Sequence, residues 1–272
     1  TVTESHSVSG ILTPSYGADG AASSDAVKVT TDPSHGTVAL AQNEDGTWTY
    51  TYTAGSVDGE TQDSFVVSVK DADGDMVPQT INVTISNSVP TITPPGEDPS
   101  SVDVTAGEII TDEALLAGGI AEHADGHAVR DTGSFVVSLN GDATGTVQIG
   151  GESGYTITLT DGADAVISGS AVKVNGVTVE VTGVAQSGDD YTISYSYELT
   201  GAQTHEDAEK IGAADPLSGS IAILVTDASG DTATGKITVE VHDDGPAVSV
   251  DKDALTVTES HSVSGILTPS YG

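Results

Sequence analysis

The seventeen residues at the start of the chain recur unchanged at its other end. Residues 1–17 and 256–272 both read TVTESHSVSGILTPSYG, so the sequence holds one period of 255 residues and the opening of a second copy. We expect the native protein to continue as a tandem array of such periods. Residues 246–260 read as a strand that leads into the repeat, so the first domain is expected to lack part of its opening strand.

A second repeat lies within the period. Residues 65–90 read FVVSVKDADGDMVPQTINVTISNSVP, and residues 221–246 read IAILVTDASGDTATGKITVEVHDDGP, which align without a gap at an offset of 156. Each segment contains a strand, an acidic turn, a second strand and a linker that ends in proline. This pattern predicts one domain at 1–90, a larger domain with extra hairpins at 91–246, and the first strand of the next copy at 247–272.

Apolar and polar residues alternate through both expected domains. The clearest runs are at 48–52, 65–69, 81–85, 135–139, 172–181 and 191–197. Asn175-Gly176 lies inside one of them and is a strong signal for a two-residue hairpin. One buried face per strand is typical of antiparallel sandwiches. The sequence therefore predicts an all-β chain of tandem antiparallel β-sandwich domains with negligible helix.

The charge balance restricts the partners of such a chain. The chain has forty-one Asp and Glu residues but only seven Lys and Arg, which gives a formal net charge of −34. A surface of this kind repels nucleic acid and anionic membranes and attracts cations. The sequence has no cysteine and no apolar run near 18 residues, so we expect no disulfides and no direct membrane insertion.

Two matching acidic turns are the strongest chemical signal. Asp71-Ala-Asp-Gly-Asp75 corresponds to Asp227-Ala-Ser-Gly-Asp231 at the offset of 156. Ca²⁺ takes six to eight oxygen ligands, and a turn of alternating acids directs several oxygens to one point. The alternative is an ordinary polar β-turn, because Asp-Gly pairs are common turn formers. Both interpretations stay open at this point.

The linker after the second domain is also acidic. Asp243 and Asp244 follow its last strand, and antiparallel geometry places them at the opposite end of the domain from the turn at 227–231. They could meet acids of the following segment, such as Asp253 or Glu259, and hold a cation between domains. A solvated acidic linker is the alternative. The matching first linker, Asn87-Ser88, has lost both acids and is the weaker candidate.

These segments resemble a known family. The stretches FVVSVKDADGD, LVTDASGDTATGKITVEVHDDGP, YGADGAA and VNGVTVEVTG are similar to the Ig-like extender repeats of large RTX adhesins, which bacteria export by type I secretion. The resemblance implies Ig-like β-sandwiches outside the cell, stiffened by calcium within and between repeats, that project a binding region for adhesion and biofilm formation. The calcium ligands that it implies are Asp71, Asp73, Asp75, Asp227, Asp231, Asp243, Asp244 and Glu259. Ser229 and the Asn87-Ser88 linker depart from the acidic pattern.

Other function classes have less support. No motif for a catalytic serine, a zinc protease or a phosphate loop is present, so we expect no enzyme, no catalytic residues and no cofactor other than calcium. His123, Asp125 and His127 could chelate a transition metal, although exposed loop histidines are the favoured interpretation. A ligand-binding or self-associating adhesin module is the alternative function. The expected partners are neighbouring repeats of the same chain and, in the alternative, a second copy.

Overall fold

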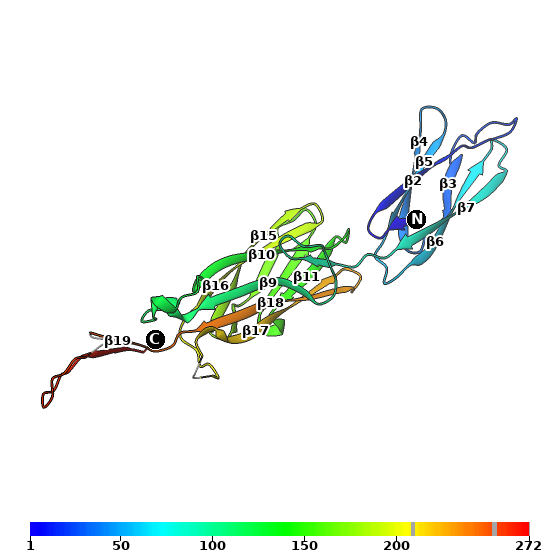
Figure 1. Ribbon diagram of the computed structural model, residues 1–272. Coiled ribbons are helices and arrows are strands. Elements are labelled where there is room, and N and C mark those ends of the chain that lie inside the picture. Colours follow the sequence, from blue (N-terminus) through cyan, green and yellow to red (C-terminus); the bar gives the residue numbers. More distant parts are fainter. Residues whose placement is uncertain (208–209, 252–254, 272) are drawn as a thin grey trace.

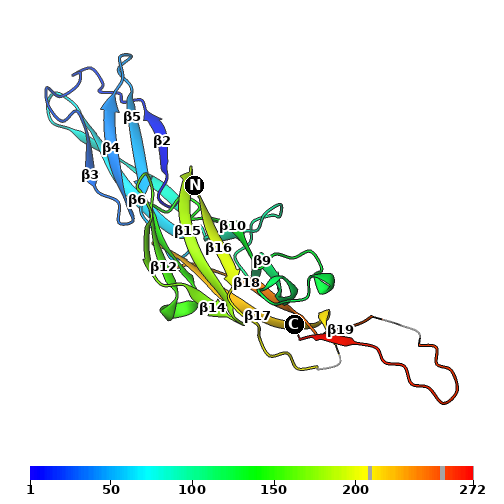
Figure 2. The ribbon, with the colours of Figure 1, turned by 90° about the vertical axis from the view of Figure 1, so that its left-hand side faces the viewer.

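The computed structural model describes residues 1–207, 210–251 and 255–271. Regular structure in this part of the chain is β-strand, apart from three single-turn 3₁₀ helices, η1 (Glu113–Leu115), η2 (Ala121–His123) and η3 (Gly151–Ser153). Two β-sandwiches lie end to end, and a hairpin of β19 (Ala247–Val250) and β20 (Leu267–Ser270) extends beyond the second one (Figures 1 and 2). The predicted all-β, Ig-like fold is confirmed.

The first sandwich has a four-stranded and a three-stranded sheet. The four-stranded sheet has the order β1 (Val2–Thr3), β7 (Met76–Ser86), β6 (Thr61–Lys70) and β3 (Val27–Thr31). The three-stranded sheet has the order β2 (Ser7–Leu12), β5 (Trp48–Ala54) and β4 (Gly36–Gln42). Tyr52 and Phe65 are fully buried between them, with stacked rings whose centroids are 6.1 Å apart. Trp48 and Tyr50 pack against this core, as their alternation predicts.

The second sandwich is larger. Its five-stranded sheet has the order β14 (Val172–Val174), β15 (Val177–Ser187), β16 (Asp190–Leu199), β10 (Arg130–Ser138) and β8 (Thr91–Thr93). Its six-stranded sheet has the order β13 (Val166–Gly169), β12 (Tyr155–Thr160), β11 (Thr144–Ile149), β17 (Gly212–Asp227), β18 (Thr232–Asp243) and β9 (Val104–Asp112). Asn175 and Gly176 have φ angles of 49° and 75° between β14 and β15, which confirms the predicted hairpin.

The topology repeats at the offset that the sequence shows. The hairpin of β6 and β7 corresponds to that of β17 and β18, and each second strand pairs in parallel with the first strand of its sheet. Val2 lies opposite Ile85, and Thr111 lies opposite Val241. Each sandwich has its own hydrophobic core, and the expected boundaries after residues 90 and 246 stay predictions.

The second copy of the opening sequence folds differently from the first. Val2 is 6% exposed in β1, whereas Val257, the same residue of the copy, is 53% exposed. The strand partners that order residues 1–17 belong to β5 and β7. Among the described residues of the tail, β20 instead pairs with β19. The repeated sequence therefore forms strands at different positions in its two copies.

Candidate cation sites

The two sandwiches meet through side chains that cross the linker. The Asn87 side chain donates a 2.8 Å hydrogen bond to Asp231, which belongs to the acidic turn of the second sandwich. In the opposite direction, the Asn140 side chain donates to the carbonyl oxygen of Val89 at 2.6 Å. The linker that has lost its acids therefore takes part in the junction through an amide.

A buried carboxylate lies at the centre of this junction. Asp142, which is 4% exposed, accepts hydrogen bonds from the hydroxyls of Ser5 and Ser56 in the first sandwich, at 3.1 and 3.3 Å. Burial raises its pKa, and the negative charges of Glu4 and Asp227 raise it further. Four acidic or hydroxyl side chains from both sandwiches therefore surround one carboxylate.

Glu4 lies at the junction on the side of the first sandwich. It is fully buried, and its carboxylate accepts hydrogen bonds from the backbone N–H of Val57 at 2.8 Å and of Ser88 at 2.6 Å. The Ser88 hydroxyl adds a third bond at 2.9 Å. These bonds fix a negative charge at the end of the domain, directly after β1.

The turn at 227–231 lies at the junction on the side of the second sandwich. One carboxylate oxygen of Asp227 accepts the backbone N–H groups of Ser229, Gly230 and Asp231 at 2.8–3.1 Å, which is an ordinary Asx-type turn. Its other oxygen, Oδ2, is buried and has no hydrogen-bond partner in the part of the chain that the structure describes. Burial raises the pKa of Asp227.

Three buried oxygens at the junction lack a donor among the described residues: Oδ2 of Asp142, Oδ2 of Asp227 and Oδ1 of Asn87. A buried acceptor without a partner is costly, and a buried charge without one is more so. Carboxylate and amide oxygens are the ligands that Ca²⁺ takes, so the donor set fits a hard cation. Over the ranges that it describes, the structure has three groups of potential ligands whose atoms lie within 4.8 Å of one another, and none of them includes these three residues. An ion at the junction would therefore have to draw the side chains of Asn87, Asp142 and Asp227 closer together.

The turn at 71–75 forms one of those compact clusters. Asp19, Asp71 and Asp73 each offer an oxygen within 4.8 Å of the others. The backbone N–H groups of Gly74 and Asp75 donate to Asp71 at 3.0 and 2.8 Å. Asp71 and Asp73 can share one proton, and this contact, together with the backbone N–H groups of Gly74 and Asp75, lowers the pKa of Asp71. This cluster is largely exposed, and Asp19 joins it from the YGADGAA segment, which carries part of the resemblance although Asp19 was not among the expected ligands.

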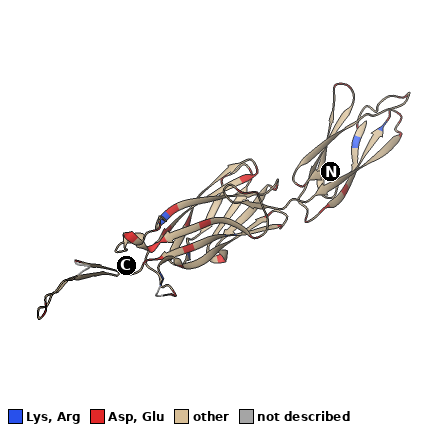
Figure 3. Cartoon of the chain, viewed as in Figure 1, with Lys and Arg blue, Asp and Glu red and all other residues tan. Residues whose placement is uncertain are grey.

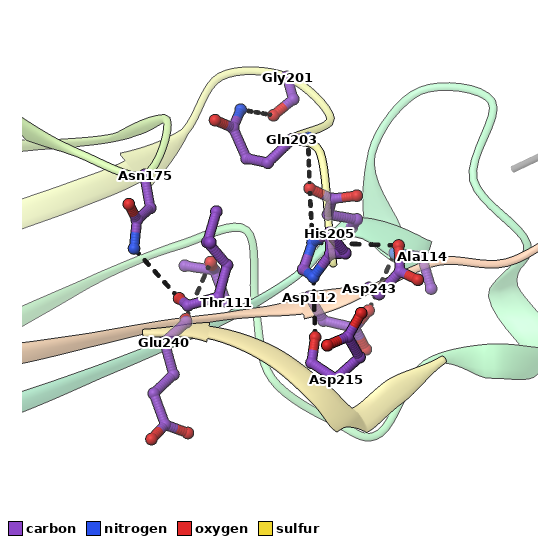
Figure 4. A network of polar contacts seen from close by, with 12 residues as sticks. Thr111, Asp112, Ala114, Asn175, Gly201, Gln203, His205, Asp215, Glu240 and Asp243 are labelled. Carbon is purple, nitrogen blue, oxygen red and sulfur yellow. Dashed lines mark hydrogen bonds and ion pairs between the residues drawn. The ribbon is translucent and has the colours of Figure 1, made fainter. Parts of the chain in front are cut away.

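The expected ligands Asp243 and Asp244 contact histidines of their own sandwich. One oxygen of Asp244 lies 2.9 Å from Nδ1 of His123, and the other accepts the backbone N–H of Ile120 at 2.9 Å. Asp243 lies beside His205 and Glu113 in a second compact cluster. Figure 4 shows His205 above Asp215 and next to Asp243.

The histidine group considered in the sequence divides in two. His123 pairs with Asp244, whereas Asp125 and His127 join the buried His242 in a third compact cluster. Nδ1 of His242 contacts the Asp125 carboxylate, and the rings of His127 and His242 meet edge to face with centroids 5.4 Å apart.

Sequence reasoning missed Glu4 and Asp142. Glu4 is the equivalent of Glu259 in the first copy of the repeat, and the resemblance did include Glu259 as a ligand. The repeat could therefore have identified Glu4 as a candidate ligand. Glu259 is exposed here, and Asp253 lies outside the described residues. Asp142 follows Asn140-Gly141, and no sequence pattern marks it; it is buried where the first sandwich contacts it through Ser5 and Ser56.

The comparisons with known proteins bear on the first sandwich. Residues 1–84 match the family model described as "Bacterial Ig domain", which is less than a third of the chain. No curated protein matches the chain significantly.

Ig-like and cadherin-like chains are among the solved structures with a detectable likeness. Four cadherin-like domains of zebrafish RET match at 10% identity and a TM-score of 0.25, over 79% of this chain and 41% of that one. A titin fragment, A168–A169, matches at 12% identity and a TM-score of 0.25, over 88% of this chain and 92% of that one. The human desmocollin-1 ectodomain matches at 13% identity and a TM-score of 0.24, over 97% of this chain and 38% of that one. No functional conclusion follows from likenesses this distant.

The topology and the family match support a bacterial Ig-like repeat. Domains of this kind suggest an extracellular structural or adhesion module, and Ig-like folds are typically non-enzymatic. Within the described residues, no helix has the length and hydrophobicity needed to cross a bilayer. Acidic residues are distributed along both sandwiches, with few basic ones between them (Figure 3).

Proposed function

We propose that the chain is a calcium-stiffened extender segment of a bacterial RTX adhesin. In this function, Ig-like repeats lie end to end outside the cell and project a binding region for adhesion and biofilm formation. The chain itself catalyses no reaction. Calcium would bind between sandwiches and at the turn at 71–75, and it would supply positive charge and coordination that the protein lacks.

The junction between the sandwiches carries this proposal. Glu4, Asp142, Asp227 and Asp231 approach one another there from both domains, and two of the carboxylates have a buried oxygen without a donor among the described residues. Burying like charges without a counter-ion is unfavourable. A divalent cation would remove this repulsion, and it would hold the two domains at one angle because its ligands come from both.

The expected energy is modest for each site. Extracellular calcium sites have dissociation constants of roughly 0.1–1 mM. At ten times that concentration, one site adds about 1.4 kcal/mol to stability. In a tandem array, such increments would stiffen every junction without any strong site.

Thermal unfolding and small-angle X-ray scattering in EDTA and in a calcium titration test the proposal. We expect calcium to raise the midpoint and to make the particle longer and stiffer. Asp142→Asn should abolish most of the scattering response, because it removes the central buried charge. Glu152→Gln changes an exposed acid in η3, at the other end of β11 from Asp142, and should leave the response intact. Equal responses in wild type and Asp142→Asn, or none in either, would show that calcium does not act at this junction.

Self-association is a second candidate, favoured by one edge strand. β13 ends the six-stranded sheet, and its four residues are all exposed, including Val166 at 63% and Ile167 at 39%. Unpaired apolar edges are sites for pairing with another chain. If copies pair here, light scattering should show a dimer that Val166→Lys dissociates. A monomer at high concentration with and without calcium would count against this candidate.

A further inference from the structure

His205 is held in a fixed orientation at the far end of the second sandwich. Its Nδ1 lies 2.8 Å from the backbone carbonyl oxygen of Asp215. A carbonyl oxygen only accepts hydrogen bonds, so Nδ1 carries the proton and donates. In the neutral ring, Nε2 then carries the lone pair. Histidines that bind metals typically donate their other ring N–H to a backbone carbonyl or carboxylate in this way.

The lone-pair side of His205 faces two carboxylates. Nε2 lies 3.5 Å from an oxygen of Glu113 and 3.9 Å from an oxygen of Asp243. The His205 and Glu113 side chains are each 4% exposed, and Nε2 has no hydrogen-bond partner in the described ranges. Burial raises the pKa of both carboxyl groups. Oε1 of Glu113, the oxygen nearest Nε2, also accepts the backbone N–H of Gln203 at 2.5 Å. Three potential ligand atoms therefore converge in a largely buried place, and Figure 4 shows two of the residues, His205 and Asp243.

The spacing is that of ligands around one small ion. Distances of 3.5 and 3.9 Å exceed the usual N–H···O range of 2.7–3.2 Å. Ligand bonds to tetrahedral zinc are about 2.1 Å, which places two ligand atoms roughly 3.4 Å apart. An imidazole nitrogen favours zinc and similar transition metals, whereas calcium takes oxygen ligands.

We propose that His205, Glu113 and Asp243 form a binding site for a transition-metal dication of the zinc type. Nε2 of His205 and one oxygen of each carboxylate would be the three protein ligands, and a fourth position would be open to water. A hollow of about 360 Å³ borders Glu113 and Asp243 and gives an ion access. The site goes beyond the calcium function, since it needs an imidazole and lies at the other end of the sandwich.

The first sandwich supplies an internal comparison. Glu4 and Glu113 follow the parallel first strands at the same register, and Asn87 stands at the position of Asp243. At the end of the first sandwich, backbone N–H groups satisfy the Glu4 carboxylate, and the ring of His6 contacts the backbone carbonyl of Glu4 instead of its side chain. The transition-metal site is therefore specific to the second type of domain end.

Zinc titration of the full chain by isothermal calorimetry, in millimolar calcium, tests the site. We expect zinc to bind despite the calcium, and His205→Asn to weaken this binding by at least about tenfold. Asparagine can still donate to the Asp215 carbonyl but lacks Nε2. Glu113→Gln is a second variant of the same shape and should weaken binding similarly, which keeps the test usable if His205→Asn does not fold.

A control separates this site from the third cluster. His127→Ala removes a ligand of the Asp125, His127 and His242 cluster and should leave the His205-dependent binding unchanged. Nitrogen NMR of the imidazoles adds a direct readout: zinc should shift Nε2 of His205 while Nδ1 stays protonated. Zinc binding that His205→Asn and Glu113→Gln leave unaltered, or no zinc binding at all, would overturn the proposal. Calcium stiffening is measured independently at Asp142, so either proposal can fail alone.

Discussion

The side chains of Asn87 and Asp231, which are 144 residues apart in sequence, are joined by a 2.8 Å hydrogen bond across the linker between the two sandwiches. The bond connects the end of β7 to the acidic turn of the second domain. It is a charge-assisted bond, the stronger class of hydrogen bond in proteins. The angle between the domains therefore depends on named side chains as well as on the length of the linker.

Asn87→Ala should loosen the junction with little effect on either core. It removes the donor to Asp231 and adds no bulk, so we expect a wider distribution of inter-domain angles and a loss of roughly 1–2 kcal/mol of docking energy. Residual dipolar couplings of the two domains in calcium-free buffer would measure this. Asn82→Ala is the matched control, because Asn82 is exposed on β7, the strand that Asn87 follows. Identical couplings for both variants would mean that the bond does not restrain the junction.

Gly141→Ala should separate the sandwiches by steric overlap. Gly141 has a φ of 108°, and a methyl group there would overlap the ring of His6 in the first sandwich. Gly74 has the same φ of 108° with no described atom within 4 Å of such a methyl group. Both substitutions carry the backbone cost of positive φ, about 1–2 kcal/mol. Only Gly141→Ala should also change the scattering profile in calcium-free buffer, and a similar change in Gly74→Ala would remove the steric explanation.

Asp63 should make the first sandwich sensitive to acid. It is 8% exposed, and although burial alone would raise its pKa, bonds from the Ser34 and His35 N–H groups and the Tyr52 hydroxyl lower it. Because the folded pKa lies below the ordinary value of 3.8, the stabilisation is present above pH 3.8 and is lost as pH falls through the folded pKa.

The difference between wild type and Asp63→Asn isolates this contribution. We expect the variant to be less stable by about 1–3 kcal/mol at neutral pH, with a gap that closes in acid. Chemical denaturation of the first sandwich from pH 7 to pH 2 would measure it. Asp58→Asn, an exposed change in the same domain, should follow wild type throughout. A gap that stays constant with pH would assign the loss to packing rather than to ionisation.

Periodicity predicted the strands because a half-buried strand must alternate, and Phe65, Val67 and Ile85 are buried as that rule requires. The Asn175-Gly176 turn was predictable for a local reason, since both residues need a positive φ. The junction was not predictable in this way. Asp142 is one acid among forty-one, and its burial depends on a contact between domains that no local pattern encodes.

The histidine clusters show the same limit. His205 and His242 lie far in sequence from Glu113 and Asp125. The six-stranded sheet brings them together by pairing β9 in parallel with β18, so that residues near 112 and 242 share one end. The topology therefore determines which of the acids meet an imidazole, and His123, which is close in sequence to Asp125 and His127, pairs with Asp244 instead.

Val2 and Val257 offer the sharpest test of how far local sequence determines structure. Both lie in the same seventeen-residue sequence, yet Val2 is 6% exposed in β1 and Val257 is 53% exposed in the tail. Val2→Ala removes two buried methyl groups and should destabilise the first sandwich by about 1.5 kcal/mol, whereas Val257→Ala should change the unfolding midpoint by little. Denaturant unfolding of both variants checks this. Equal destabilisation would show that the second copy packs onto a sandwich in solution. A loss confined to Val2→Ala would show that the strands of an ordered neighbour, and not the repeated letters, give this segment its structure.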